Sequence, residues 1–485
     1  MIAKTARLIP ILLGIIILTV SCGKQTKDLT ITTKSDEARK LFYEGLEKHD
    51  YFYFDEARAY FGQAVELDPD FAMAYYYWAI CSQTADAMQE RLAKAADLTD
   101  NVSEPERLII LSRKAMMDDS IVVAREMLEH LVELKPHSDR AHYLLGNFYY
   151  QQREWELAEH ELKKSVELNP DFAPPYNMLG YLYANTERYP EAIEALKKYS
   201  ELRPKEPNPH DSMGEIFLAM GDYDNSIKEY KKALKLESDF IYSLIGIGHN
   251  EVFMGNYDKA REIYDDVARR ARNVEDTNYA YMWKTISYLH QQDYEAALKS
   301  LDEQLAFAKA HTDIYTQGSI YYQMAAIYAS MGQLEKALDY IGEVRRIANR
   351  PDIRAGIKES FLRESLSMEA IILTRLGRRD EANKRLAEYK KSAVESKNRV
   401  ILMHFRGLEG IIAFWNKDYE SAIERLSGAD PLSPMFKYYL GESYLKQGNT
   451  EEARRIFSQL VGFNRNSFSY GIVRPKAMKI IAKIS

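Results

Sequence analysis

The sequence predicts an all-α protein in which about twelve pairs of short helices stack into one elongated solenoid. Two observations support this prediction. Small and aromatic residues recur at intervals of 34 residues through much of the chain. In addition, 485 residues are too many for one ordinary globular core. The composition, 46% hydrophobic and 28% charged, is typical of a folded protein and excludes a disordered or collagen-like chain.

The first 21 residues differ from the rest and predict a signal peptide. Lys4 and Arg7 precede an apolar run over residues 8–20, which is short for a membrane-spanning helix. The run ends at Cys22, and a cysteine at this place resembles the lipobox of bacterial lipoproteins. The resemblance implies that Cys22 is lipidated and becomes the new N-terminus, although Thr19 stands where the family prefers an aliphatic residue. The alternative is an ordinary secreted protein with a cysteine near its cleavage site.

Residues 22–36 are expected to form a tether between the lipid and the folded part, because they are largely polar and lack a helical apolar pattern. Fatty chains on Cys22 would anchor the protein, since each buried methylene contributes about 0.8 kcal/mol. Gly23 and Lys24 follow the cysteine, without the aspartate that retains lipoproteins at the inner membrane of enteric bacteria. The resemblance therefore implies a lipid-anchored protein of the bacterial cell envelope on the periplasmic face, and it favours the outer membrane.

The net charge indicates which kinds of partner the chain can bind, and the cysteine content indicates whether a disulfide can form. Without residues 1–21 the chain has 63 Lys and Arg against 72 Asp and Glu, a net charge of −9, which argues against general nucleic-acid binding. Cys81 would have no disulfide partner once Cys22 is lipidated. Its position next to the apolar end of an expected helix predicts a small buried core residue.

The repeat pattern is clearest in the middle of the chain. It begins with Gly146, Tyr149, Ala158 and Pro170, and it returns 34 residues later at Gly180, Tyr183, Ala192 and Pro204, and again at Gly214 and Phe217 with Ser226 in place of the alanine. At these residues the sequence resembles the tetratricopeptide repeat (TPR) family, and the resemblance extends over nearly all of the chain after the tether. It implies a right-handed superhelix of helix–turn–helix pairs.

The residue types have a physical reason. Glycine and alanine allow two helix axes to approach closely, and the aromatic residues fill the remaining space. Proline has no backbone N–H and disfavours helix in the residue before it, so each proline marks the end of a second helix. One pair cannot bury its apolar face alone, and neighbouring pairs must stack into a continuous core.

The repeats can be placed in order along the chain. We expect them to begin near Ala38, Ala72, Pro105, Asp139, Ala173, Pro207, Ile241, Asn278, Gly318, Arg363, Met403 and Pro434. The starts are 34 residues apart from Pro105 to Ile241 and irregular afterwards, which predicts a regular array over residues 37–272 and an irregular one over 273–485. A hinge is expected near Arg272–Asp276, and a last helix from Arg474 to Ile484 is expected to cap the open end.

The resemblance also implies that the first helix of each repeat lines a concave groove. The side chains expected to face this groove are aromatic, amide and acidic: Tyr143, Asn147, Tyr150, Asn177, Tyr181, Asn185, Asp211, Glu215, Tyr242 and His249. Amides can bind the backbone of an extended peptide, and tyrosine provides flat contact area at low entropic cost. The sequence therefore predicts a peptide or protein segment bound across residues 139–253. The alternative is a solvated inner face without a specific ligand.

A second candidate surface is basic. Residues 342–400 contain 15 Lys and Arg against nine Asp and Glu, a balance of +6. Seven of its arginines cluster near two expected helix ends: Arg345, Arg346, Arg350 and Arg354 near one, and Arg375, Arg378 and Arg379 near the other. Basic side chains suit helix C-termini, so these residues are expected either to be capped and solvated or to bind an acidic partner or anionic lipid headgroups.

The sequence contains no motif that predicts catalysis. Its ten histidines lack metal-ligand spacing, and no phosphate loop, dinucleotide loop or nucleophile elbow is present. We therefore expect no enzymatic activity, metal or cofactor. The predicted function is that of a membrane-tethered scaffold or adaptor for protein–protein interaction, and a glycan- or ligand-binding helical-repeat lipoprotein is the alternative. The oligomeric state is left open.

Overall fold

The structure is a computed structural model that describes residues 31–82, 84–353 and 355–484. These residues form 25 α-helices and a short 3-10 turn at Thr99–Asn101, and they contain no β-strand. The predicted all-α architecture is confirmed. The expected signal peptide, Cys22 and most of the tether lie outside the described residues.

The first seven helix pairs form a unit that we call the first arm. Each helix packs against the next one along the chain. The pairs are α1 (Asp36–Asp50) with α2 (Phe54–Leu67), α3 (Ala72–Ile80) with α4 (Ala85–Asp97), α5 (Glu104–Met117) with α6 (Ile121–Leu134), α7 (Asp139–Gln151) with α8 (Trp155–Leu168), α9 (Pro174–Asn185) with α10 (Tyr189–Leu202), α11 (Asn208–Met220) with α12 (Tyr223–Leu236), and α13 (Ile241–Phe253) with α14 (Tyr257–Arg270).

The remaining helices form the second arm, which contains five less regular pairs, the first three of them longer, and one last helix. They are α15 (Val274–Gln291) with α16 (Tyr294–Ala310), α17 (Ile314–Ser330) with α18 (Leu334–Ala348), α19 (Ala355–Arg375) with α20 (Arg379–Ser396), α21 (Arg399–Trp415) with α22 (Tyr419–Ser427), α23 (Pro434–Lys446) with α24 (Thr450–Val461), and α25 (Phe468–Ile484). The described chain thus contains the twelve pairs that the sequence predicted.

The repeated glycines lie where two helices of one pair cross. A Cβ atom on Gly45 would lie 2.9 Å from the Phe61 ring, and one on Gly180 would lie 2.7 Å from the Leu196 side chain. Ser226, which replaces the usual alanine, is fully buried, and its hydroxyl donates a hydrogen bond of 2.7 Å to the Gly214 carbonyl. Close approach of the helix axes is therefore the reason for the small residues, as the sequence predicted.

Local sequence also defines where the helices begin and end. The hydroxyl oxygens of Ser35 and Ser138 accept hydrogen bonds from backbone N–H groups in the first turns of α1 and α7. At the other end of a pair, α8 stops at Leu168 and α10 at Leu202, each two residues before a proline. The turns between pairs are consequently short, and successive pairs stack without a spacer.

Helix α25 begins at Phe468, whereas the sequence predicted its start at Arg474. Burial of Tyr470 and Val473 extends α25 by a further turn and more in the N-terminal direction, so that Pro475 lies inside the helix. The helix packs against the last pair, and it also reaches α15, where a Cβ atom on Gly471 would lie 3.1 Å from Leu289. It therefore links the end of the second arm to its beginning.

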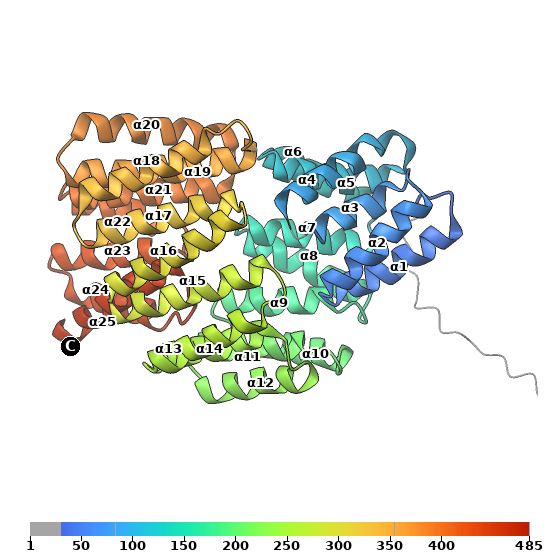
Figure 1. Ribbon diagram of the computed structural model, residues 1–485, viewed down its shortest axis with the longest axis horizontal. Coiled ribbons are helices and arrows are strands. Elements are labelled where there is room, and N and C mark those ends of the chain that lie inside the picture. Colours follow the sequence, from blue (N-terminus) through green and yellow to red (C-terminus); the bar gives the residue numbers. More distant parts are fainter. Residues whose placement is uncertain (1–30, 83, 354, 485) are drawn as a thin grey trace, which may run out of the picture.

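The two arms lie side by side and are joined at one end by α10–α14, so that the chain folds back on itself (Figure 1). At the junction, α14 packs directly against α15, and the backbone N–H of Arg272 donates a hydrogen bond of 3.0 Å to the Asp276 carboxylate. The hinge expected at these residues stays a prediction. None of the described helices has the length and apolar character needed to cross a membrane.

Candidate binding site on the inner wall

The side chains predicted to line the groove lie on α7, α9, α11 and α13, and several contact one another between successive repeats. The Tyr181 hydroxyl donates a hydrogen bond of 2.8 Å to Glu215. The Asn185 amide donates one of 2.8 Å to the Tyr150 hydroxyl. These contacts join neighbouring repeats into one continuous inner wall.

The predicted residues differ in their accessibility to a ligand. Tyr242 is 53% exposed, whereas Asn177 is only 6% exposed. The Asn177 Oδ1 atom is enclosed and accepts no hydrogen bond within the described structure. Asp211 is partly buried and accepts a hydrogen bond of 2.6 Å from Ser243. Burial and the nearby charge of Glu215 outweigh that bond and raise the pKa of Asp211 to about 7. Asp211 therefore holds a proton more readily than an ordinary aspartate does.

Part of the predicted groove is occupied by the chain itself. The segment Phe463–Ser467, which we call the strap, connects α24 to α25 and crosses the inner wall. Its Arg465 guanidinium donates a hydrogen bond to the Asn185 side chain. Its Asn466 amide nitrogen lies 3.1 Å from Nδ1 of His249. Burial lowers the pKa of His249 to about 3, so this histidine is neutral in the contact. A partner cannot use Asn185 and His249 while the strap is in place.

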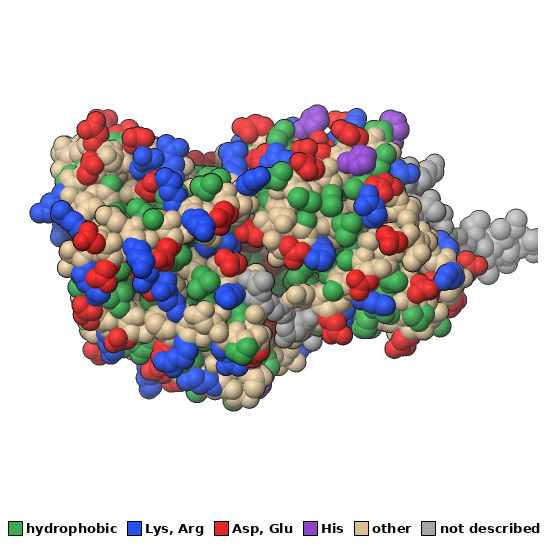
Figure 2. All heavy atoms as spheres, turned by 90° about the horizontal axis from the view of Figure 1, so that it is seen from above, with side chains coloured by type: hydrophobic (Ala, Val, Ile, Leu, Met, Phe, Trp, Pro, Cys, Tyr) green, Lys and Arg blue, Asp and Glu red, His purple; other side chains and the backbone are tan. Residues whose placement is uncertain are grey.

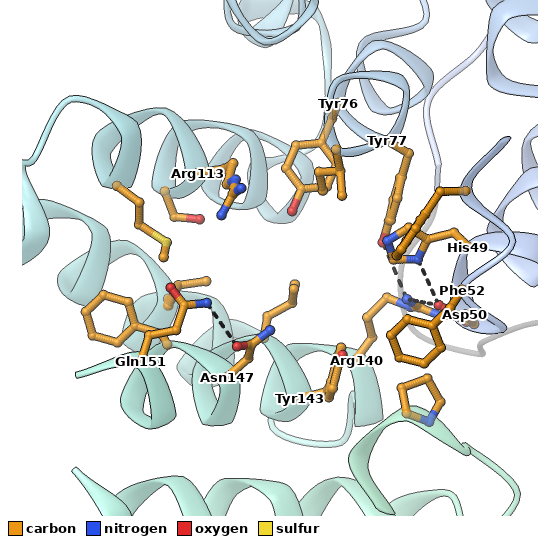
Figure 3. Close-up of a pocket in the computed structure, with 18 residues that line it drawn as sticks. His49, Asp50, Phe52, Tyr76, Tyr77, Arg113, Arg140, Tyr143, Asn147 and Gln151 are labelled. Carbon is orange, nitrogen blue, oxygen red and sulfur yellow. Dashed lines mark hydrogen bonds and ion pairs between the residues drawn. The ribbon is translucent and has the colours of Figure 1, made fainter. Parts of the chain in front are cut away.

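The first part of the inner wall contains a cavity of about 300 Å³ (Figure 3). Its walls come from α1, α3, α5 and α7, and Figure 3 shows their side chains converging on one space. Most of the lining is apolar or aromatic, and its polar members are His49, Asp50, Ser112, Arg113, Arg140, Asn147 and Gln151 together with the tyrosines Tyr76, Tyr77 and Tyr143. Tyr143 and Asn147 are groove residues that the sequence predicted.

One side of the cavity is formed by a buried ion pair. The two terminal nitrogens of Arg140 lie 3.1 and 2.5 Å from the carboxylate oxygens of Asp50, and Arg140 is only 4% exposed. Burial alone would raise the pKa of Asp50, but the charge of Arg140 and the hydrogen bonds from His49 and Arg140 lower it to about 2. Arg140 also donates to the Tyr77 hydroxyl at 3.4 Å. The pair fixes α1 to α7 across two intervening pairs of helices.

A second cationic side chain, that of Arg113, lies on the opposite side of the cavity. The Arg113 side chain has no ion pair or hydrogen bond with any described side chain, and its Nε atom is enclosed without a partner. Close by in Figure 3, the Gln151 amide donates a hydrogen bond of 3.0 Å to Asn147. The cavity thus combines apolar walls with one unpaired guanidinium and two amides. These groups can receive a side chain and the polar backbone of a ligand.

Sequence reasoning missed Asp50, Arg113 and Arg140. Asp50 and Arg140 are 90 residues apart, and no periodic pattern connects them. Arg113 lies on α5, and the groove predicted from the sequence began only at residue 139. The same register, extended to the first helix of the preceding repeat, is the sequence signal for Arg113.

The predicted basic residues are largely paired with acidic side chains. The ion pairs are Arg345 with Glu369 at 3.1 Å, Arg346 with Glu343 at 2.7 Å, Arg350 with Asp352 at 2.8 Å, and Arg378 with Glu381 at 2.6 Å. Arg375 donates a hydrogen bond of 2.8 Å to the Ala329 carbonyl, and its guanidinium lies 4.7 Å from the Trp415 ring centroid. Arg379 is exposed at the start of α20, and Arg354 lies outside the described residues. Basic and acidic side chains are accordingly intermixed over the face shown in Figure 2.

The described residues contain no group of three His, Cys, Asp or Glu side chains placed to hold a metal ion. Cys81 is buried as a free thiol, and burial raises its pKa to about 12. A thiol in this state is a poor nucleophile.

Models of the tetratricopeptide repeat match the sequence at seven places, which together cover more than half of the chain. They match residues 115–179, 245–311, 409–467, 52–71, 173–206, 210–240 and 318–348. No curated protein has a matching sequence.

Solved structures with a similar helical arrangement include a tetratricopeptide repeat protein from Parabacteroides merdae ATCC 43184. It has 14% identity and a TM-score of 0.38, and the match covers 54% of this chain and 99% of that chain. MamA has 23% identity and a TM-score of 0.25, and the match covers 40% of this chain and 94% of that chain. PilF from Pseudomonas aeruginosa has 20% identity and a TM-score of 0.32, and the match covers 48% of this chain and 94% of that chain.

Proposed function

Because the chain belongs to the tetratricopeptide repeat family, we propose that it is a scaffold that binds a protein or peptide partner at the surface of a membrane in the bacterial cell envelope. The repeats supply a rigid curved wall, and lipid on Cys22 holds this wall in two dimensions. Confinement raises the effective concentration of the scaffold and its membrane-associated partner without any new contact. The apolar run and the cysteine at the N-terminus support the membrane-bound part of the proposal.

The observation that carries the binding function is the cavity with its unpaired Arg113. Its volume of about 300 Å³ can take one or two side chains of a partner. An acidic side chain would satisfy the Arg113 guanidinium, and a peptide backbone could bond to Asn147 and Gln151. Tyr76 and Tyr77 are only 4% and 3% exposed, so they offer little ring face for stacking on a sugar. A peptide segment therefore fits the cavity better than a glycan.

Crosslinking from the cavity should identify this partner. A photo-reactive amino acid at Gln151, introduced into the lipidated chain in its native membrane, is expected to give protein adducts. We expect substitution of Arg113→Met to reduce these adducts about tenfold or more, because a hydrogen-bonded charge contributes roughly 1.5–3 kcal/mol. The control position is Arg346, which lies in the second arm and is paired within its own helix.

The cavity would lose its assigned role if adducts formed equally at positions 151 and 346, or if Arg113→Met left the adducts at 151 unchanged. Crosslinks to glycan in place of protein would instead favour the alternative function.

Substitution of Cys22→Ala, with residues 1–21 replaced by a signal peptide that is cleaved without lipidation, should transfer the protein from the membrane fraction to the soluble fraction. The reason is that the net charge of the mature chain is negative, so that no strong electrostatic attraction to anionic lipid replaces the fatty chains. Cell fractionation and immunoblotting measure the change. Cys81→Ser serves as the control, because Cys81 is buried in the folded chain. Retention of the Cys22→Ala chain on membranes that have been washed with salt and carbonate would contradict lipid anchoring.

A further inference from the structure

We propose that the second arm is a gate over the inner-wall cavity, held closed by three arginine contacts with the first arm. This inference deepens the proposed function, because it concerns access to the same cavity. The three contacts are Arg363 with Asp119, Arg153 with Asp430, and Arg465 with Asn185. We call them the clasps.

The cavity and the space between the arms are connected. A second hollow of about 420 Å³ lies where α5 and α6 of the first arm face Asn398 and Val400 of the second arm. Arg113, Met116 and Gln151 line both this hollow and the cavity. A ligand that reaches Arg113 from the hollow must therefore pass between the arms. Figure 2 shows this side of the molecule as a notch between the two arms.

The clasps are polar and lie on different elements. An Arg363 nitrogen on α19 is 3.1 Å from the Asp119 carboxylate, in the turn after α5. Arg153 follows α7, and its Nε atom is 3.7 Å from Asp430, which also accepts from His404 at 3.1 Å. Arg465, in the strap, donates to Asn185 at the end of α9. Contacts of this kind weaken when salt screens the charges.

The apolar clusters of the molecule are distributed differently from the clasps. One apolar cluster runs through the first arm as far as Ile216, and another runs from Leu218 through α13–α17 to α25. Among the described residues, no apolar cluster combines side chains of α1–α10 with side chains of the second arm. The core therefore holds each repeat to its neighbours along the chain, and the far ends of the arms share no buried apolar cluster.

Near the junction the arms are connected by apolar contacts. The ring centroids of Phe253 on α13 and Tyr470 on α25 are 5.8 Å apart, and Tyr470 is fully buried. The junction side will stay closed while the far side separates, since small changes at successive repeat interfaces add up along a solenoid. Opening would widen the hollow beside Arg113, Met116 and Gln151 without exposing the core.

The distance between the arms tests the gate. Spin labels at Val122→Cys on α6 and Glu395→Cys on α20, in a Cys81→Ser background, report this distance in the full mature chain. We expect the combined variant Arg153→Ala, Arg363→Ala and Arg465→Ala to shift the distribution to longer distances by several ångströms. Added salt should shift the clasped protein in the same direction, because the Debye length falls from about 10 Å at 0.1 M to about 3 Å at 1 M.

The matched control removes three arginines that are paired within the second arm, Arg346→Ala, Arg350→Ala and Arg378→Ala. This control should leave the distance unchanged, and circular dichroism should show equal helix content in both combined variants. Identical distance distributions in the clasp variant, the control and the parent protein would overturn the gate.

Access to the cavity is measured without any partner. A thiol reagent should modify Met116→Cys severalfold faster in the clasp variant than in the control variant, because Met116 is only partly exposed and lines both the cavity and the hollow. Separated arms with an unchanged modification rate would show that the second arm does not control the cavity, and would also overturn the gate. Because this assay needs no binding partner, the gate can hold even if the photo-crosslinking experiment refutes the proposed binding function, and the reverse is equally possible.

Discussion

Replacement of Arg140 by methionine is expected to destabilise the first arm by about 3–5 kcal/mol, because it leaves the Asp50 carboxylate without its cation in a buried site. Arg140 and Asp50 are connected by two hydrogen bonds, and their side chains are 5% and 14% exposed. Methionine keeps much of the side-chain volume, so the loss is mainly electrostatic. Urea unfolding measures the free energy, and amide hydrogen exchange in α1 and α7 locates the change.

Arg113→Met is the matched control for this prediction. Both arginines line the same cavity, but the Arg113 side chain has no ion pair with a described side chain. Its removal should therefore change the unfolding free energy by less than about 1 kcal/mol. Equal destabilisation by the two substitutions would show that cavity volume, and not the buried charge of Asp50, determines the loss.

The pH dependence of Arg140→Met follows from the same pair. The pKa of Asp50 is about 2 in the folded protein, below the ordinary value of 3.8. A carboxylate with a lowered folded-state pKa contributes stability above its unfolded pKa, and this contribution disappears as the pH falls toward 2. In Arg140→Met the remaining burial favours protonation. The difference in stability between the two proteins should therefore be largest near neutral pH and shrink as the pH falls through the raised Asp50 pKa of the variant toward 2.

The helix pairs could be predicted from the sequence because local rules determine them. Gly180 marks a helix crossing, and Pro204 marks the end of a helix, and neither depends on distant parts of the chain. The inner-wall positions of Tyr143 and Asn147 follow from the same register. The start of α25 at Phe468 was missed because burial of Tyr470 against the second arm overrides the local preference of Pro475 for a helix start.

The closed form of the molecule could not be predicted in this way. Whether Arg363 meets Asp119 depends on the curvature accumulated over many repeat interfaces, and each interface contributes a small rotation that no single motif encodes. The strap lies between two helices, and the repeat register does not specify where such a connection rests on the wall. Contacts between neighbouring repeats were thus predictable from the sequence, and contacts between the two arms were not.

A valine at Gly246 is expected to destabilise the first arm by about 3 kcal/mol, the upper end of the usual range for overpacked cores. The Tyr230 ring is enclosed between two glycines of successive pairs. A Cβ atom on Gly214 would lie 2.8 Å from this ring, and one on Gly246 would overlap with it. Tyr230 is only 3% exposed and cannot swing into solvent. The β-branched side chain would therefore push α13 away from α12.

Gly342→Ala provides the control, because Gly342 lies inside α18 and a Cβ atom there would meet nothing within 4 Å. Alanine is preferred to glycine in a helix, so this substitution should stabilise the protein by roughly 0.5–1 kcal/mol. Urea unfolding of both variants tests the opposite signs. If Gly246→Val were tolerated without loss, the interface between successive pairs would be loose enough to repack. The curved wall that carries the cavity would then lack the rigidity that a scaffold requires.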